Sequence, residues 1–363
     1  MPEGAEIAVI GAGVVGLSTA VHLLDLGLSV RVYERGTPGC EQSAGTARIF
    51  QHAHDDPRLV AMAATSRRIY KRWEERFGAD LLTPSGVLIL GSGATTQAAA
   101  LRKAGDISFD MVAEPGAHLP LLDDASGPAL RDTDGGMIHA RSVIDALAAV
   151  LGGRLVTDDV MALRAVDDGV EVVCQAQITR HARAVICAGR NTAALARGLG
   201  VQLPVEQGVQ VRITFPLSEP HGDILPCFQD TTGVLGEAGA YGVPLPGGDR
   251  YALGLTETAR VSPGGTVENP AQLQAFAERI CALAERLPGV EPEPVEQRAC
   301  WTTAVGWSDS GVAVWEADDV LLLVGNHLFK HAPALGEALA AAAAGESLPS
   351  DLAPAAQLGK PTG

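Results

Sequence analysis

The chain has 363 residues, of which 47% are hydrophobic and 19% are charged, and this balance excludes an intrinsically disordered protein. Lys and Arg number 27 against 43 Asp and Glu, which gives a net charge of −16. That charge, with no basic run anywhere in the chain, argues against binding to nucleic acid or to an anionic membrane.

The N-terminal segment predicts a strand–helix–strand unit. Ile7–Ile10 is a short apolar run typical of a buried strand. A glycine-rich turn and a helical pattern follow, and Gly27 stands where a helix ends in a left-handed residue. Leu28–Tyr33 predicts a second strand, which Glu34 ends. This order is that of the βαβ unit of dinucleotide-binding folds.

The turn carries the spacing Gly11-x-Gly13-x-x-Gly16. In such a loop the first glycine makes the tight turn, the second lets the backbone approach a pyrophosphate, and the third lets the helix pack on the strand. Glu34 is placed to accept hydrogen bonds from a ribose diol. A glycine-rich turn without a ligand is the alternative. The early position of the motif, with no second glycine motif or Cys/His pair, favours FAD over NAD.

Further elements follow from periodicity and from apolar runs. Helices are predicted at Pro57–Phe77, Gln97–Ala104, Ser142–Leu151, Asn269–Leu287 and Pro333–Ala344. Strands are predicted at Gly86–Leu90, Leu155–Val156, Ala162–Val166, Val170–Gln175, Ala184–Cys187 and Val320–Val324. The stretch Val209–Leu255 predicts an antiparallel sheet, Leu119–Arg131 predicts a loop, and the tail after Gly345 predicts a loose end.

Four features in this order carry a family resemblance: the N-terminal glycine motif with Glu34, the segment Gly45–His54, the segment Gly135–Val143 followed later by Val185–Gly189, and Arg298–Thr302 followed by Leu323–Lys330. With them the chain resembles the FAD-dependent amine oxidoreductases of the D-amino-acid oxidase superfamily, nearest to monomeric sarcosine oxidase and N-methyltryptophan oxidase.

The resemblance implies an α/β plus α+β fold in two domains. A Rossmann-like FAD-binding domain would comprise residues 1–80, 140–200 and 300–363. An inserted substrate domain, residues 81–139 and 201–299, would be built on a mixed, largely antiparallel sheet.

The resemblance also implies which residues bind FAD. The set is Gly11, Gly13, Val15, Gly16, Glu34, Arg35, Ser43, Thr46, Arg48, Val160, Ala188, Gly189, Cys300, Gly325 and Lys330. In the family, backbone at the position of Val160 lies near the adenine. Cys300 matches a cysteine that bonds covalently to the flavin, so FAD is expected with a covalent link through Cys300, the alternative being an ordinary buried cysteine.

The residues expected to do chemistry are Lys330, Arg48, Gln51, His52 and His54. Lys330 matches a lysine that holds a substrate carboxylate, the alternative being a solvated surface lysine. Gln51 replaces an arginine that would pair with that carboxylate, so a charged fork is lost. Histidines at 52 and 54 would either tune the amine or flavin or serve a structural role.

A second departure from the family concerns oxygen. Ala252 stands where family oxidases carry a lysine above the flavin, and Thr256 stands where a histidine is common. A cation there promotes electron transfer to dioxygen. Its absence indicates slow oxygen use or a different cationic group.

The function implied is FAD-dependent oxidation of a C–N bond in a secondary amine or amino-acid-derived substrate, by hydride transfer to flavin. The products would be an imine and, with oxygen, hydrogen peroxide. A specialised biosynthetic substrate is favoured over sarcosine. The alternatives are a dehydrogenase with another electron acceptor and a flavin-binding homologue without amine oxidase activity.

The remaining expectations concern partners and location. No apolar stretch approaches the roughly 20 residues of a membrane span, and the acidic start is unlike a signal peptide. The six cysteines show no Cys-x-x-Cys pair, so no metal site is expected. We therefore expect a cytoplasmic monomer that meets a small-molecule amine and dioxygen or another acceptor.

Overall fold

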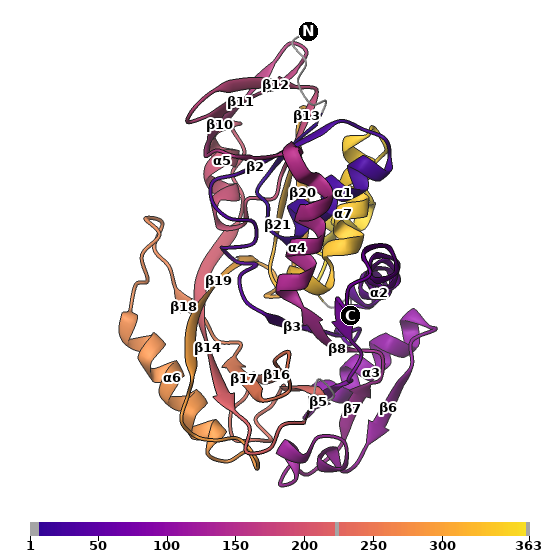
Figure 1. The fold of residues 1–363 in the computed structure, drawn as a ribbon, viewed down its shortest axis with the longest axis vertical. Coiled ribbons are helices and arrows are strands. Elements are labelled where there is room, and N and C mark those ends of the chain that lie inside the picture. Colours follow the sequence, from indigo (N-terminus) through magenta and orange to yellow (C-terminus); the bar gives the residue numbers. More distant parts are fainter. Residues whose placement is uncertain (1–6, 222–224, 361–363) are drawn as a thin grey trace.

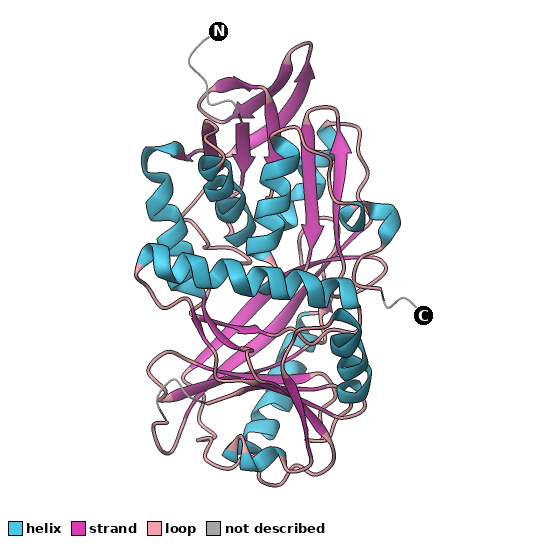
Figure 2. Cartoon of the chain, turned by 90° about the vertical axis from the view of Figure 1, so that its right-hand side faces the viewer, coloured by secondary structure: helices cyan, strands magenta, loops and turns pink. Residues whose placement is uncertain are grey.

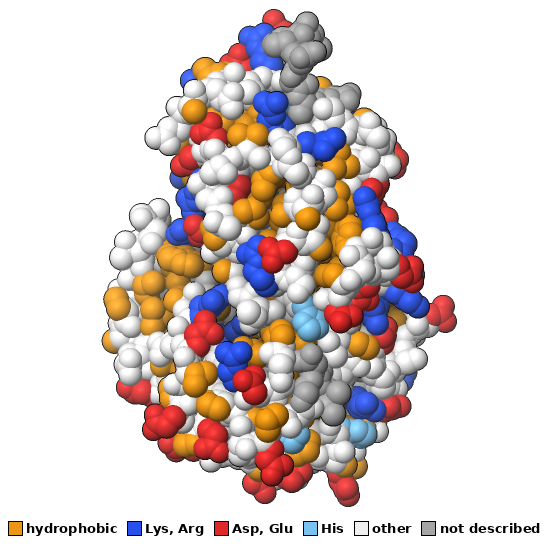
Figure 3. All heavy atoms as spheres, viewed as in Figure 1, with side chains coloured by type: hydrophobic (Ala, Val, Ile, Leu, Met, Phe, Trp, Pro, Cys, Tyr) orange, Lys and Arg blue, Asp and Glu red, His pale blue; other side chains and the backbone are white. Residues whose placement is uncertain are grey.

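The computed structural model describes residues 7–221 and 225–360. Two lobes lie one above the other, and the nine-stranded sheet with helix α6 forms the lower one (Figure 1). Helix α2 (Pro57–Phe77), seen end-on in Figure 1, lies across the junction of the lobes in Figure 2. On the face drawn in Figure 3, Lys and Arg side chains are interspersed with Asp and Glu. Among the described residues no helix is both long and apolar enough to cross a membrane.

The upper lobe is built on a six-stranded sheet. Its order is β20 (Val312–Ala317), β21 (Val320–Gly325), β13 (Arg183–Ile186), β1 (Ile7–Ile10), β2 (Val30–Glu34) and β9 (Leu155–Thr157). All neighbours are parallel except the β20–β21 pair. The strands come from both ends of the chain and from its middle, so this sheet is completed only by the C-terminal segment.

Helices α1 (Val14–Asp25), α4 (Ala140–Leu151) and α7 (Ala332–Ala343) share one apolar core with this sheet. Helices α1 and α7 approach closely, because a Cβ on Gly336 would lie 2.1 Å from Ser18 Oγ. A second core, on the other face of the sheet, includes α5 (Thr192–Gly198) and the three-stranded sheet of β10 (Val160–Val166), β11 (Gly169–Cys174) and β12 (Ile178–His181).

The lower lobe is built on a nine-stranded sheet. Its strands are β18 (Ala259–Arg260), β14 (Val205–Pro216), β17 (Arg250–Leu255), β16 (Ala240–Pro244), β15 (Cys227–Asp230), β5 (Val87–Leu90), β7 (Ala129–Asp132) and β6 (Phe109–Val112), with β19 (Glu296–Val305) on β14. Only the β15–β5 pair among these described strands is parallel.

Helices α6 (Pro270–Ala284) and α3 (Gly93–Ala104) cover opposite faces of this sheet. Side chains alternate along β5, so that Leu88 packs in the core that contains α6 and Val87 packs in the core that contains α3. Between the lobes, β3 (Ala47–Phe50), β8 (Gly136–His139) and β4 (Leu82–Thr83) form a small antiparallel sheet.

Several predicted boundaries hold because local signals set them. Helix α2 has the predicted bounds, with Asp56 as N-cap accepting from Arg58 N at 2.9 Å and Gly78 at φ 62° as C-cap. Helix α6 begins at Pro270 with Asn269 accepting from Ala271 N at 3.2 Å. The predicted parallel unit and largely antiparallel sheet are both present, whereas the domain limits themselves stay a prediction.

Two predictions were wrong. The predicted loop Leu119–Arg131 ends in strand β7, whose residues Ala129 and Leu130 are buried in the sheet. The tail after Gly345 is packed rather than loose: Leu352 and Leu358 are buried, and Gly359 N donates to Asp56 Oδ2 at 2.9 Å. Neither segment has a helical or alternating period, so its burial leaves no pattern in the sequence.

Candidate functional site

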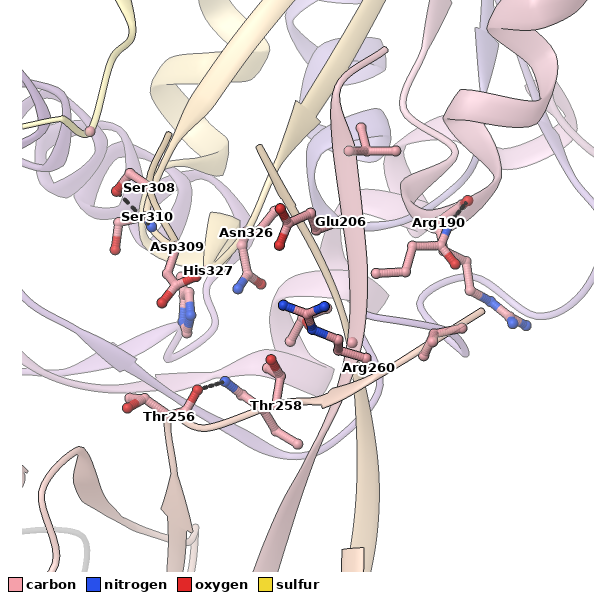
Figure 4. Close-up of a pocket in the computed structure, with 18 of the residues that line it drawn as sticks. Arg190, Glu206, Thr256, Thr258, Arg260, Ser308, Asp309, Ser310, Asn326 and His327 are labelled. Carbon is pink, nitrogen blue, oxygen red and sulfur yellow. Dashed lines mark hydrogen bonds between the residues drawn. The ribbon is translucent and has the colours of Figure 1, made fainter. Parts of the chain in front are cut away.

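Two connected cavities lie between the lobes. The first, which we call the cofactor cavity, has a volume of about 490 Å³ and runs from the β1–α1 loop to the residues after β21. The second, the polar cavity, has a volume of about 1400 Å³. Figure 4 shows it between Glu206, Thr258 and Arg260 of the lower lobe's sheet and Asp309 and His327. The residues common to both cavities include Gln229, Tyr241, Thr256, His327 and Lys330.

The β1–α1 loop requires glycine at two positions for different reasons. Gly11 has φ +99°, and a Cβ there would lie 2.6 Å from the Cys187 carbonyl oxygen at the end of β13. A Cβ on Gly16 would lie 2.0 Å from the carbonyl oxygen of Gly11. The loop is therefore compressed between two strands and the first turn of α1, which holds the helix N-terminus at the cavity.

Polar groups around this loop fit a dinucleotide. Glu34 accepts from Ala12 N at 2.8 Å and from Gly36 N at 3.0 Å, and its carboxylate keeps further lone pairs for a ribose diol. Ser43 Oγ accepts from Val14 N at 3.0 Å, across the start of α1. A Cβ on Gly13 would lie 3.2 Å from that Oγ, in the space where the N-terminal amide groups of the helix face the cavity. These residues fit FAD, with its pyrophosphate at the helix N-terminus.

Most residues predicted to bind FAD line this one cavity. They are Gly11, Gly13, Val15, Glu34, Arg35, Ser43, Arg48, Val160, Ala188, Gly189, Cys300, Gly325 and Lys330. Two lie outside its lining. Gly16 packs against Gly11 within the loop, and the carbonyl of Thr46 accepts from Ala140 N at 2.8 Å. Gly16 thus shapes the β1–α1 loop, whereas Thr46 connects the start of β3 to the start of α4.

Lys330 lies where the two cavities meet, after β21. Burial lowers the pKa of its ammonium to about 8, against a smaller raising effect of Asp132. Among the described residues the ammonium has no hydrogen-bond partner, so its charge is left for a ligand. The alternative of a solvated surface lysine does not fit, because the side chain is 7% exposed.

The two predicted histidines point to different surroundings. His52 is buried outside both cavity linings, with Nδ1 3.1 Å from Asp132 Oδ1 and its backbone N donating to the same carboxylate. His54 lines the polar cavity, its ring 5.0 Å from that of His331. Burial, with Lys330 nearby, lowers the pKa of His54 and His331 well below the ordinary value. Both rings are therefore neutral near neutral pH.

Gln51 lines the polar cavity, but its hydrogens are already used. Its Nε2 donates to the Ala53 carbonyl at 2.8 Å and to Gln229 Oε1 at 3.1 Å. Because Ala53 offers only an acceptor, the orientation of the Gln51 amide is fixed, and that of Gln229 follows. Gln229 is then left with its own NH₂ group in a position common to both cavities. Sequence reasoning missed Gln229, whose one signal is a glutamine inside the short strand Cys227–Asp230.

Cys300 lies at the cofactor cavity on strand β19. Its register partner is Gln210 of β14, its thiol is free, and it is half-buried. Ala252, by contrast, is fully buried in an apolar cluster beneath β17, so that position adds no charge to the site.

A family model matches residues 6–342, and its description is FAD dependent oxidoreductase (DAO). The chain belongs to this family. The predicted membership of the D-amino-acid oxidase superfamily, its α/β plus α+β fold class and its FAD cofactor are confirmed. The covalent bond through Cys300 is a separate matter and stays a prediction.

Known relatives agree with this assignment. The chain is 25% identical over 366 residues to a glycine oxidase of Bacillus licheniformis, covering 92% of each protein. Among solved structures it resembles NikD, an amino acid oxidase essential for nikkomycin biosynthesis, with TM-score 0.81, 19% identity and coverage of 98% and 96%. It also resembles L-proline dehydrogenase of P. horikoshii, with TM-score 0.79, 20% identity and coverage of 97% and 96%. These likenesses to solved structures concern the fold.

Proposed function

We propose that the protein oxidises the C–N bond of a secondary amine or amino-acid-derived substrate, giving an imine and, with dioxygen, hydrogen peroxide. FAD, when bound, supplies the two-electron acceptor for this oxidation. The observation that carries the proposal is the junction of the two cavities at Lys330, because a substrate in the polar cavity meets the cofactor there. A glycine oxidase among the relatives acts on the same class of bond.

The charges at this junction favour a substrate with an uncharged amine. The buried ammonium of Lys330 and the half-buried guanidinium of Arg48 both repel a substrate ammonium. The neighbouring His54 and His331 are neutral, so they neither add to this repulsion nor offset it. An amine that arrives deprotonated needs no side chain to remove its proton.

Substrate binding would rest on three neutral or singly charged groups. Lys330 offers a point charge, Gln229 offers an NH₂ donor, and Gln51 holds Gln229 in place. A guanidinium fork for a free carboxylate is absent at Gln51, and charge-assisted hydrogen bonds are worth about 1.5–3 kcal/mol against about 0.5–1.5 for neutral ones. The polar cavity of about 1400 Å³ exceeds what sarcosine fills. This volume supports a substrate larger than sarcosine, and we propose a specialised biosynthetic one.

The experiment is anaerobic reduction of the purified yellow protein by sarcosine and by its uncharged amide, sarcosinamide. Bleaching of the flavin by an amine supports the proposal. At equal concentration of neutral amine, we expect sarcosinamide to reduce the flavin at least as fast as sarcosine. A screen of cyclic and N-methyl amines in which none bleaches the flavin would instead indicate a flavin-binding homologue without amine oxidase activity.

A dehydrogenase is the second candidate, and Ala252 is the observation that favours it. Its side chain lies in an apolar cluster, so β17 presents no cation there to assist electron transfer to dioxygen. Turnover with dioxygen is to be compared with turnover under argon with an artificial dye. Turnover only with the dye favours the dehydrogenase.

A further inference from the structure

Three arginines from separate segments converge beside the cofactor cavity. Arg48 lies on β3, Arg212 on β14 and Arg298 on β19, and the last two are direct register partners. A Cβ on Gly45 would lie 2.8 Å from Arg48 Nη1, 3.0 Å from Arg298 Nη1 and 3.4 Å from Arg212 Nη2. The three guanidinium groups therefore surround one small volume.

Within the described residues, neither Arg48 nor Arg212 forms an ion pair with a carboxylate. Arg48 donates to two backbone carbonyls, that of Ala44 and that of Ala47, the latter at 2.9 Å. Arg212 donates to the same Ala47 carbonyl at 3.1 Å.

The carboxylate bound to the cluster is that of Glu296, 3.1 Å from Arg298 and nearly half exposed. Arg298 Nη1 is buried without a partner. Burial, and then Arg212, lower the pKa of Arg48 to about 10.

Two of the three charges, those of Arg48 and Arg212, face the cofactor rather than the outer part of a substrate, whereas Arg298 lines neither cavity and supports Arg212 from the neighbouring strand. Arg48 and Arg212 line the cofactor cavity, together with Cys300 and Tyr241, and neither arginine lines the polar cavity. Along the β14–β17 ladder, Arg212 is opposite Gly254 and Thr214 is opposite Ala252. Arg212 thus lies on the strand next to Ala252, and its side chain is on the same face of the sheet as the uncharged Ala252 side chain.

We propose that Arg48, Arg212 and Arg298 form a cationic wall that stabilises negative charge on the bound flavin, with Arg212 replacing the cation that β17 lacks. The inference rests on the FAD site of the proposed function. Hydride transfer from a neutral amine would carry two electrons and one proton to the flavin and leave one negative charge beside the wall, while the second proton would leave the amine nitrogen for solvent. Dioxygen would then take both electrons, the flavin's proton and one proton from solvent, which gives hydrogen peroxide and removes that charge.

The test uses sulfite, an anion that binds oxidised flavin and bleaches its visible absorbance, so no substrate is needed. In the FAD-bound protein, Arg212→Met is expected to raise the sulfite Kd at least tenfold, which corresponds to about 1.4 kcal/mol. Arg212→Lys keeps the charge and is expected to stay within about threefold of the unaltered protein. Arg154→Met, at an exposed arginine outside both cavities, is the matched control and should leave the Kd unchanged.

Arg298→Met provides a second reading from the neighbouring strand and should also weaken sulfite binding. If Arg212→Met does not fold or bind FAD, Arg298→Met and Arg212→Lys decide the matter. Unchanged sulfite affinity in the methionine variants that carry FAD overturns the inference. So does a rise in KM for sarcosine without a change in sulfite Kd, because the cluster would then bind the substrate. Protein that never carries FAD would instead overturn the proposed function.

Discussion

Replacement of Gly13 by valine tests whether the β1–α1 loop holds the cofactor. The backbone at Gly13 has φ −74° and ψ 176°, which valine adopts without strain. The new Cβ would lie 3.2 Å from Ser43 Oγ, so the serine must shift by a few tenths of an ångström. Loss of its hydrogen bond to Val14 N would cost the apoprotein about 0.5–1.5 kcal/mol. The fold should therefore survive.

FAD binding should not survive, because the valine methyl groups occupy the place of the pyrophosphate at the helix N-terminus. We expect at least a hundredfold loss of FAD affinity, about 2.7 kcal/mol. The assay is FAD titration of apoprotein, with Cys300→Ser in the background so that a covalent bond cannot mask the loss. Gly153→Val, at a glycine with open space around it, is the control. Undiminished FAD affinity in the Gly13 variant would show that the cofactor loop lies elsewhere.

Three further predictions concern single side chains. Acid precipitation of the holoprotein should leave yellow colour in the pellet, and Cys300→Ser should release it; colour only in the supernatant would exclude the covalent bond. Burial lowers the pKa of Lys330 to about 8, so its charge is present below that pH and is lost above it. The Kd of the anion benzoate, measured by flavin absorbance, should therefore rise as the pH passes 8. In Lys330→Met the Kd should not change over this range. Asp132→Asn should lower the free energy of unfolding in urea by about 1.5–3 kcal/mol, because the fully buried carboxylate binds His52. The control Asp134→Asn, at a half-exposed carboxylate, should lower it by under about 1 kcal/mol. Equal losses would show that Asp132 does not stabilise the fold through His52.

The sequence predicted those parts of the molecule whose signals are local. The glycine spacing of the first loop and the caps of α2 and α6 depend on contacts within a few residues, so their positions could be predicted closely. Family resemblance then pointed to Lys330 and Arg48, and both lie at the cavity.

Contacts between distant segments could not be predicted in the same way. Arg212 meets Arg298 only because β14 and β19 pair in one particular register, and a shift of β19 by one residue would turn Arg298 to the other face of the sheet. The glutamine at 51 predicts a hydrogen-bond donor for substrate, yet Ala53 and Gln229 take its hydrogens. Asp132 is likewise identified as the partner of His52 only by the fold.

The interleaved order of the six-stranded sheet has a consequence for biosynthesis. Strand β1 is made first, but the cofactor cavity also needs Cys300 on β19 and the residues that follow β21, near the other end of the chain. A ribosome-bound chain that lacks these segments presents the glycine loop without the opposite wall. Complete enclosure of FAD therefore has to wait until these segments have been made, and truncation before β19 should yield colourless protein even though the whole nucleotide loop is intact.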